Sequence, residues 1–584
     1  MTGPELEFPP HVLREYALVA DGERGALIGP RGDVSWMCAP VWDSGSVFSS
    51  LIGGAGAYAV TPAGRYVWGG YYEQGSLIWR SRWVTEDGIV ECREALAFPG
   101  ERDRVVLLRR VIALDCDAHV RVELEPRAGY GAEPLRDLSR EAGVWTGRTG
   151  DLRIRWQGGG PARPSPGRTR RRLTMELTVP AGTHHDLVLE MAARPLDEDP
   201  VDADDAWRAT KAAWQSAVPE LSACLSPADT QQSYAVLRGL TGSSGGMVAA
   251  ATTSLPERAE QGRNYDYRFV WIRDQCYAGQ AAAAAGDTRL LSDAVRFVGA
   301  RLLEHGSRLA PAYTAAGGPV PDQHDLGLPG YPGGFDRVGN WVNQQFQLDA
   351  FGESLLLLAQ AERCGVLDSE GLKAAEVAAA AIVERWQEPD AGIWEIDNRP
   401  WTHSRLTAAA GLKALASVLP GGRSAVEMLA LADRIVADTA AAAVHADGHW
   451  MRSPDDDGLD GALLFPPLRG ALPADDPRTV ATLRAYQRDL VEDGYAYRFR
   501  QGSGALGDAE GSFSLCGFLM SMALAQQGER EEALRWWERT KGSCGPPMLY
   551  SEEYDVTEHQ MRGNLPQAFV HAVMVESAAR LARS

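Results

Sequence analysis

The order of apolar and polar residues divides the chain into a first third of strands and a longer part of helices. Up to about residue 205, short runs rich in Val, Tyr, Trp and Thr alternate with polar positions and are separated by Gly, Asp and Pro. The clearest predicted strands are 58–62, 77–84, 89–97, 105–114, 119–125, 152–157, 173–179 and 186–190. Many short strands at even spacing predict a β-sandwich of two facing sheets.

Helical periodicity dominates from Asp229 onward, where alanine, the best helix former, becomes abundant. About twelve amphipathic helices are predicted to begin near Asp229, Ile272, Thr288, Asn343, Glu370, His403, Ala425, Asp457, Arg478, Ser512, Arg530 and Asn564. Short junctions would join antiparallel neighbours, whereas the long loops 305–341 and 541–564 carry aromatic and acidic residues. Six helical hairpins with function gathered on one set of loops predict an (α/α)6 barrel, and a helical solenoid is the weaker alternative.

Three segments follow from these patterns. Residues 1–205 form the predicted β-sandwich domain, residues 206–228 a helical linker, and residues 229–584 a catalytic (α/α)6 barrel. Within the first domain, Glu86-Asp87-Gly88 is typical of a hairpin turn, and the Gly-, Pro- and Arg-rich stretch 158–172 predicts an exposed loop.

Composition and charge narrow the class of protein. The net charge of -20 is spread along 584 residues, which argues against nucleic acid or an anionic membrane as a partner. No apolar run reaches the roughly 20 residues of a membrane span, and the N-terminus lacks a signal-peptide pattern. The eight cysteines are far apart and form no metal-type cluster. We expect a cytoplasmic protein with a small neutral substrate and no metal or organic cofactor; the oligomeric state, monomer or homo-oligomer, stays open.

Two distant stretches each place a carboxylate beside aromatic residues. Glu395 follows Gly392-Ile393-Trp394 on a predicted loop, where the indole of Trp394 would favour the protonated carboxyl that a general acid needs. Glu552 and Glu553 lie in Leu549-Tyr550-Ser551-Glu552-Glu553-Tyr554-Asp555, and only some of these acids can face a pocket. Two carboxylates in different environments are the pair that glycoside hydrolysis requires, although a lone Trp-Glu pair is usually a surface loop.

Other stretches carry groups suited to a sugar ring. The segment 263–274 ends in Tyr267, Trp271, Arg273 and Asp274, so aromatic faces and a charged fork could bind one ring, or the charges could simply begin a helix. The stretch 339–346 combines Trp341 with several amides. After the Glu395 loop come Trp401 and His403, and we interpret His403 as a hydrogen-bonding support rather than a base.

Six segments in order resemble the motifs of glycoside hydrolase family 15, which contains glucoamylases, glucodextranases, isomaltose-type glucohydrolases and some bacterial trehalases. They are RNYDYRFVWIRD, GNWVNQQFQLDAFGE, GIWEIDNRPWTHSR, GSFSLCGF, LYSEEYD and GNLPQAF. The stretches 25–29 and 33–44 also resemble the opening of bacterial members. The resemblance covers nearly the whole chain.

This resemblance implies a β-sandwich before an (α/α)6 barrel and an inverting reaction at a non-reducing end. Glu395 then matches the general acid and Glu552 the general base, with Arg273 and Asp274 holding the terminal glucose. The residues expected to bind substrate are Arg273, Asp274, Tyr267, Trp271, Trp341, Trp394, Trp401, His403, Glu553 and Trp36. Tyr265, Gln275 and the Asn340-Trp341 pair depart from the family pattern on the leaving-group side.

The sequence therefore predicts an exo-acting inverting α-glucosidase that releases β-D-glucose from short α-1,6- or α-1,4-linked gluco-oligosaccharides such as isomaltose or maltose. An α,α-trehalase is the alternative substrate assignment. A phosphorylase and a catalytically silent sugar-binding protein are the alternatives from other classes. The N-terminal domain is expected to be a packing partner, or else to extend a loop with Trp36, Trp42 and Phe48 over the barrel mouth.

Overall fold

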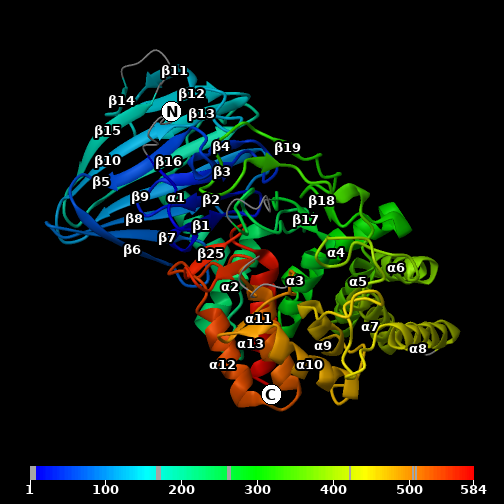
Figure 1. The fold of residues 1–584 in the computed structure, drawn as a ribbon. Helices are drawn as coiled ribbons and strands as arrows, with labels where there is room; N and C mark the ends of the chain where they lie inside the picture. The colour runs from blue at the N-terminus through cyan, green and yellow to red at the C-terminus, as the bar shows by residue number, and fades with distance from the viewer. Residues whose placement is uncertain are drawn as a thin grey trace.

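A computed structural model describes residues 8–165, 172–258, 265–419, 422–502, 506 and 510–583. Strands form the first part of the chain and helices the rest, so a β-sandwich lies against one side of a helical barrel (Figure 1). The change falls between Ala192, where the last long strand ends, and Ala203, where the first α-helix begins. The architecture is the one that the residue pattern predicts.

Two antiparallel sheets form the sandwich. The larger, in spatial order, consists of β11 (Arg136–Glu141), β12 (Val144–Thr149), β13 (Leu152–Gln157), β16 (His184–Ala192), β9 (Arg104–Ala113), β8 (Ile89–Leu96), β7 (Trp79–Thr85) and β6 (Tyr66–Tyr72). The smaller consists of β14 (Arg163–Pro164), β15 (Leu173–Val179), β10 (Ala118–Glu125) and β5 (Ala57–Pro62). In β10, buried Val120 and Val122 alternate with exposed His119 and Arg121, as a strand with one face in the core requires. The predicted turn at Glu86-Asp87-Gly88 joins β7 to β8.

A third sheet, absent from the predicted strands, joins the two domains. It contains β1 (Ala17–Ala20), β2 (Gly25–Ile28), β3 (Val34–Cys38) and β4 (Ser46–Phe48), all fully buried. Leu18 packs with the barrel core, whereas its neighbour Val19 packs with the sandwich core. Because both faces are covered, these strands lack the polar alternation by which a half-buried strand is recognised.

Twelve α-helices in the described part form the barrel as two concentric rings. The inner ring contains α3 (Ile272–Ala284), α5 (Leu348–Arg363), α7 (Thr402–Val418), α9 (Phe465–Leu468), α11 (Ser514–Gln526) and α13 (Ala568–Leu581). The outer ring contains α2 (Pro227–Leu240), α4 (Arg289–His305), α6 (Ser369–Arg385), α8 (Arg423–Ala442), α10 (Pro477–Asp489) and α12 (Arg530–Lys541). Two-residue and three-residue strands cross the joining loops: β17 (Val270–Trp271), β18 (Ala312–Tyr313), β19 (His324–Asp325), β20 (Arg337–Val338), β21 (Val491–Glu492), β22 (Tyr495–Ala496), β23 (Ser512–Phe513), β24 (Glu553–Asp555) and β25 (Gln560–Arg562).

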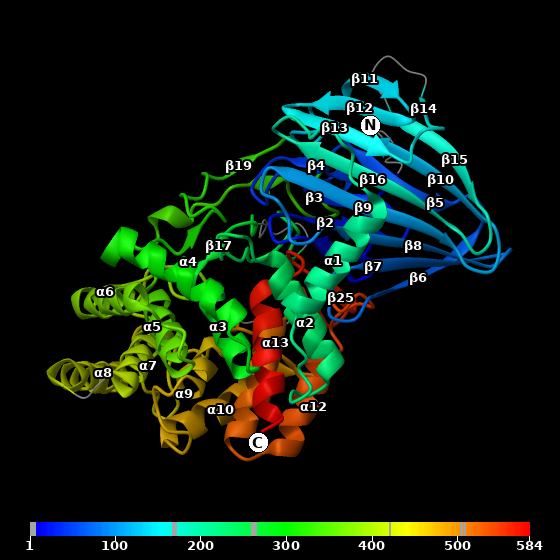
Figure 2. The same ribbon diagram turned by 180° about the vertical axis from the view of Figure 1, so that it is seen from behind.

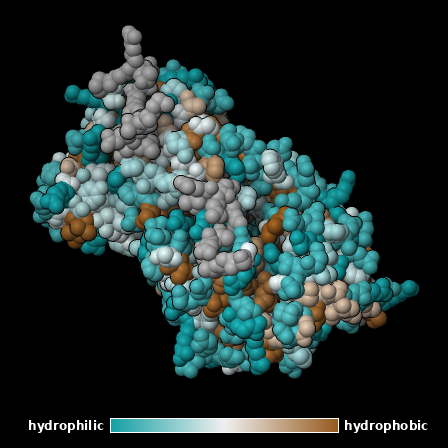
Figure 3. Space-filling model, in the orientation of Figure 1, coloured by the Kyte–Doolittle hydropathy of each residue, from teal (hydrophilic) through white to brown (hydrophobic). Residues whose placement is uncertain are grey.

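Residue pattern decides which ring a helix joins. Inner α11 is buried continuously over 514–524, because apolar residues cover its whole circumference. Outer α8 buries only Ala425, Ala432, Ile435 and Thr439, which lie along one stripe. The polar remainder of such outer helices contributes to a surface that is mainly hydrophilic on the face shown in Figure 3. Among the described helices, none has the length and apolarity to cross a membrane.

Two predicted helix starts are wrong. The helix expected near Asp457 is only the single turn α9, which begins eight residues later with Pro466 and Pro467 in its first turn, where proline is tolerated, and which ends just before Gly470 at a φ of +85°. The helix expected at Asn343 begins at Leu348, after a short 3₁₀ turn at Val342–Gln344. In both places the extra loop length precedes a helix of the inner ring.

Helix α1 (Ala203–Ala217) packs across the large sheet at the junction of the domains (Figure 2). Trp214 stacks on Phe98 with ring centroids 4.0 Å apart, and the guanidinium of Arg93 lies 4.3 Å from the ring of Trp207. The two tryptophans of the predicted linker therefore belong to the interface of the domains.

Candidate active site

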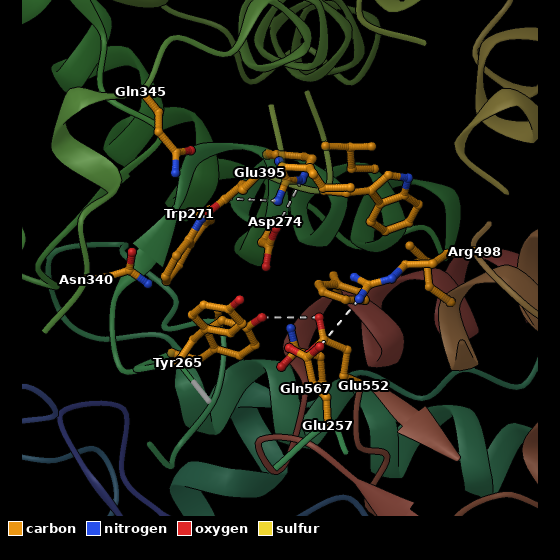
Figure 4. Close-up of a pocket in the computed structure, with 18 of the residues that line it drawn as sticks. Glu257, Tyr265, Trp271, Asp274, Asn340, Gln345, Glu395, Arg498, Glu552 and Gln567 are labelled. Carbon is orange, nitrogen blue, oxygen red and sulfur yellow. Dashed lines mark hydrogen bonds and ion pairs between the residues drawn. The ribbon is translucent and has the colours of Figure 1, made fainter. Parts of the chain in front are cut away.

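A cavity of about 640 Å³ opens where the inner helices α3, α11 and α13 begin. Its described lining residues all fall between Ala249 and Phe569, so the barrel and its loops supply them and the N-terminal domain supplies none. Polar and aromatic side chains share the walls, and Glu395 and Glu552 face each other across open space (Figure 4). A concave site with a few converging polar groups is the usual form of a small-ligand site.

Glu395 lies on the loop between α6 and α7 in a strained backbone conformation. Its φ of +53° falls in the left-handed region, which non-glycine residues rarely adopt. Its carboxylate accepts a hydrogen bond of 2.6 Å from Trp271 Nε1 and lies 3.8 Å from a guanidinium nitrogen of Arg273. The neighbouring indole of Trp394 donates its N–H to Asp460 at 2.7 Å. Trp394 and Trp271 both line the cavity.

Buried Asp390 anchors the Glu395 loop. One of its oxygens accepts hydrogen bonds from the backbone N–H groups of Leu348 and Gly392, both at 3.1 Å, and from Ser404 Oγ at 2.8 Å. Burial, reinforced by the charge of Asp349, raises the pKa of Asp390 to about 8. Asp390 therefore ties the Glu395 loop to the starts of α5 and α7 with a carboxyl that holds its proton near neutrality.

Arg273 and Asp274, in the first turn of α3, also line the cavity. Arg273 donates to Gln347 Oε1 at 3.0 Å and lies 3.6 Å from Asp274 and 3.8 Å from Asp349. Burial raises the pKa of Asp274 to about 7, opposed by Arg273 and reinforced by Glu395. Buried Asp274 Oδ1 has no hydrogen-bond partner in the described protein, so a ligand hydroxyl could satisfy it.

Glu552 occupies the opposite wall, immediately before β24. It accepts a hydrogen bond of 3.3 Å from Tyr267 Oη, and its other oxygen is buried without a hydrogen-bond partner among the described residues. Burial and the charge of Glu257 raise the pKa of Glu552 well above its usual value, and the guanidinium of Arg498 opposes the shift. Arg498 lies 3.4 Å from Glu257, which also lines the cavity.

Glu553 points away from the cavity. Its carboxylate accepts a hydrogen bond of 2.9 Å from the backbone N–H of Gly511 and lies 3.7 Å from Arg498. Successive side chains of a strand point to opposite faces, so of these two adjacent acids only Glu552 lines the cavity. The expectation that Glu553 binds substrate is therefore corrected: it supports Arg498 from behind the wall.

Comparison with known proteins places this geometry in a family. The family model described as "Glycosyl hydrolases family 15" matches residues 232–579, and a second, described as "Trehalase-like, N-terminal", matches residues 9–151. The chain belongs to glycosyl hydrolases family 15.

Named relatives extend along the whole chain. A "Trehalase" of Mycolicibacterium smegmatis is 31% identical over 100% of this chain and 93% of its own length. A "Trehalase" of Mycobacterium tuberculosis is 30% identical over 99% of this chain and 90% of its own. A solved bacterial glucoamylase in complex with acarbose has the same fold, with a TM-score of 0.71, 13% identity, and coverage of 100% of this chain and 96% of that one. This chain is thus a glycoside hydrolase with a β-sandwich and an (α/α)6 barrel.

Most of the residues that the sequence singles out meet at the family 15 cavity. The lining includes Glu395, Glu552, Arg273, Asp274, Tyr267, Trp271, Trp341 and Trp394. Trp341 is 65% exposed. The first two residues of the motif at 263–274, Arg263 and Asn264, lie outside the described residues.

Three further expectations are corrected. Trp401 packs on Gly392 beneath the Glu395 loop and donates its N–H to the carbonyl of Asp397 at 3.0 Å. His403, expected to bind substrate, lies behind the same loop in α7, where its Nε2 is 3.3 Å from Thr407 Oγ1 and where burial and nearby arginines lower its pKa to about 3, so the ring stays neutral. Trp36 is buried at the domain junction and donates to the carbonyl of Ala251 at 2.8 Å. These three side chains are absent from the cavity lining.

Sequence reasoning missed two charged residues of the cavity wall that carries Glu552: Glu257 and Arg498. Arg498 had a detectable signal, because Tyr497-Arg498-Phe499-Arg500 repeats the alternation of aromatic residues and arginine found at 267–273. Glu257 follows Pro256 in a short apolar stretch and offered no comparable pattern. Two groups of described residues have metal-ligand spacing, one at His445, Asp447 and His449 and one around His184, and neither contributes to the cavity lining.

Proposed function

We propose that the chain is an α,α-trehalase that hydrolyses trehalose to two glucose molecules with inversion at the attacked carbon. The observation that carries this proposal is the full-length similarity to two mycobacterial proteins named Trehalase, which includes the N-terminal domain. The expectation of an isomaltose- or maltose-like substrate has less support, because the curated relatives bear the name of its alternative.

Each cavity wall has a role in the proposed reaction. Glu395 gives a proton to the bridging oxygen as the bond to one anomeric carbon breaks. Glu552 takes a proton from the water that attacks that carbon from the opposite face. The water oxygen becomes the new anomeric hydroxyl, and the proton on the bridging oxygen completes the departing glucose. Opposed positions in Figure 4 suit this division. We keep the prediction of about 6.5–9.5 Å between the two carboxyl groups, the separation of inverting enzymes.

The cavity suits a small, fully hydroxylated substrate. Its volume of about 640 Å³ is within the usual range for small-molecule sites. Arg273 and Asp274 lie beside Glu395 and would hold the ring that is attacked. Asn340 and Gln345 line the same cavity, where amides can bond the hydroxyls of a second ring. Trehalose presents such hydroxyls on both rings.

The decisive experiment follows the anomers formed from trehalose by rapid proton NMR. Inversion at one carbon releases one β-glucose, while the departing unit keeps its bond to the bridging oxygen and leaves as α-glucose. We therefore expect equal initial amounts of the two anomers, with solvent ¹⁸O only in the β product. Two α products would contradict inversion.

Maltose and isomaltose are the matched substrates, because each contains the same attacked glucose with another leaving group. Trehalose is expected to give the highest kcat/KM. A higher value on either of the others would return the assignment to a gluco-oligosaccharide hydrolase. No glucose from any of the three would favour a silent sugar-binding protein. The cytoplasm is the proposed location, since eight widely spaced cysteines are typical of a reducing compartment.

A further inference from the structure

The segment Tyr265–Arg268 connects the cavity to the N-terminal domain through alternating side chains. Tyr265 and Tyr267 line the cavity, and their rings stack with centroids 6.3 Å apart. Asp266 and Arg268 are buried and do not contribute to the lining. In an extended segment neighbouring side chains point in opposite directions, so whatever holds Arg268 also sets where Tyr267 points.

The N-terminal domain binds the guanidinium of Arg268 with four groups. Arg268 donates to the carbonyls of Ser44 at 2.9 Å and Trp42 at 3.4 Å, to Cys38 Sγ at 3.2 Å and to Tyr130 Oη at 3.1 Å. Arg268 is 2% exposed. A planar guanidinium whose N–H groups are bound by several buried acceptors has little freedom to move, in contrast to a surface ion pair.

Asp266 extends the same connection to a second cavity wall. It pairs with Arg268 through both carboxylate oxygens, at 2.9 and 2.7 Å. It also accepts a hydrogen bond of 2.9 Å from the backbone N–H of Gly339, the residue before Asn340 and Trp341 of the lining. One buried pair thus joins the tyrosine segment, the Asn340 loop and the N-terminal domain.

Tyr130 is held in an unusual backbone conformation where it meets Arg268. Its φ is +58°, in the left-handed region that disfavours a residue with a bulky side chain. Its ring lies 6.4 Å from that of Trp36, and its N–H bonds to the carbonyl of Ser46 at 3.0 Å. Strained residues of this kind persist where the surrounding structure fixes them, and they are concentrated at functional sites.

We propose that the N-terminal domain takes part in catalysis by fixing Arg268, which positions Tyr267 against the general base Glu552. Arg268 is a positioning residue, since it touches neither the cavity nor the reacting atoms. The domain thereby acts on the site although none of its described residues lines the cavity. This inference rests on the proposed role of Glu552, but not on the identity of the sugar.

A double-mutant cycle tests the proposal. Arg268→Lys keeps the charge and loses the fork, Tyr130→Phe removes one acceptor of that fork, and Tyr267→Phe removes the hydroxyl that meets Glu552. Each change is made alone, and the first two are also combined with Tyr267→Phe. Activity is measured on whichever α-glucoside the unmodified chain hydrolyses, so failure with trehalose leaves this test intact.

Arg109→Lys is the matched control. Arg109 is equally buried within the N-terminal domain, pairs with Glu94 and donates to the carbonyls of Gly32 and Tyr58, with no contact to the cavity segment. It should lower the Tm as Arg268→Lys does, yet leave kcat of the folded enzyme unchanged.

We expect Arg268→Lys to lower kcat about 10- to 100-fold with KM changed less than threefold, because a small misplacement of a catalytic contact has effects of this size. Tyr130→Phe should lower kcat about two- to tenfold. In the Tyr267→Phe background, the logarithm of each fold-loss in kcat should be less than about half of its value in the unmodified background. Equal losses in both backgrounds, or a lower Tm with kcat intact, would overturn the proposal. If Arg268→Lys does not fold, the Tyr130 cycle decides.

Discussion

The two walls of the cavity place a carboxyl group in opposite surroundings. Glu395 lies on a long loop, keeps 21% of its side chain exposed and meets two N–H donor groups, the indole of Trp271 and the guanidinium of Arg273. Glu552 is 5% exposed, precedes a short strand and shares its wall with Glu257. The loop that carries Glu395, the proposed acid loop, is held by buried hydrogen bonds to Asp390. The wall that carries Glu552, the proposed base wall, is held by Arg498, which lies close to Glu257 and Glu553.

This difference shows that the two carboxyls of a proposed catalytic pair can be held by different kinds of structural element. A proton donor must reach the leaving oxygen, which suits an accessible loop. A base must be ionised before it can take a proton from water, whereas burial and the charge of Glu257 favour the protonated form of Glu552. Arg498 and Tyr267 are the neighbours that favour its ionised form. The proposed assignment of Glu395 as acid and Glu552 as base therefore rests on the family motifs and on the opposed positions of the two carboxyls (Figure 4).

The largest expected effect comes from removing either carboxyl. Glu395→Gln and Glu552→Gln should each lower kcat by about 10²- to 10⁴-fold while substrate binding persists, because each removes one proton transfer. Glu553→Gln is the control for Glu552→Gln, since its side chain lies behind the wall. Steady-state kinetics and calorimetric binding of glucose measure the two quantities. A greater kcat loss in Glu553→Gln than in Glu552→Gln would move the base role to Glu553.

The next effect separates the donors of the two walls. Trp271→Phe removes the N–H that bonds Glu395, and Tyr267→Phe removes the hydroxyl that bonds Glu552. A hydrogen bond to a charged group contributes about 1.5–3 kcal/mol, so kcat/KM should fall by about 10- to 150-fold in each. Trp394→Phe, whose N–H serves Asp460, should cost less than Trp271→Phe. A larger loss of kcat/KM in Trp394→Phe would show that the indole of Trp394 contributes more to the function of Glu395 than that of Trp271.

The pH dependence of kcat/KM tests the protonation of Glu552. Because the pKa of Glu552 is raised well above its ordinary value, kcat/KM should fall on the acidic side at a higher pH than for an ordinary glutamate. Glu257→Gln removes a neighbouring negative charge, while Arg498 and Tyr267 continue to favour the ionised form. The acidic limb should move to lower pH by roughly one unit. An unmoved limb would exclude Glu257 as the cause of the shift.

The last effect concerns stability rather than catalysis, at the residue that anchors the Glu395 loop. The pKa of Asp390 is raised to about 8, so the folded protein binds this proton more tightly than the unfolded chain between about pH 4 and pH 8. Its contribution to stability is present below that window and is lost as pH rises through it, by up to about 1.4 kcal/mol per pH unit. Asp390→Asn should flatten this part of the dependence. Urea unfolding at pH 5, 6.5 and 8 measures it, and an unchanged slope would contradict the anchor's protonation.

Local sequence patterns predict much of the fold. Alternation predicted β10 because one of its faces is buried, and continuous apolarity made α11 an inner helix. Fully buried β1 escaped prediction because its form depends on the partners that cover both of its faces, and α9 was predicted eight residues too early. Local pattern reports a residue's own burial preference and not the surfaces that meet it.

The sequence by itself determined the order of domains, the family motifs and the carboxylates Glu395 and Glu552 as candidates. Only the tertiary structure decided that Glu552 and not Glu553 faces the cavity, that Trp271 donates its N–H to Glu395, and that Glu257 lies in the same wall as Glu552. The physical reason is distance along the chain. Trp271 and Glu395 are 124 positions apart, and Tyr267 and Glu552 are 285 apart, so the packing of whole helices brings them together. The proposed role of the N-terminal domain in the active site could not be predicted from the sequence for the same reason. It acts through Arg268, which lies more than two hundred residues after its partners Trp42 and Ser44.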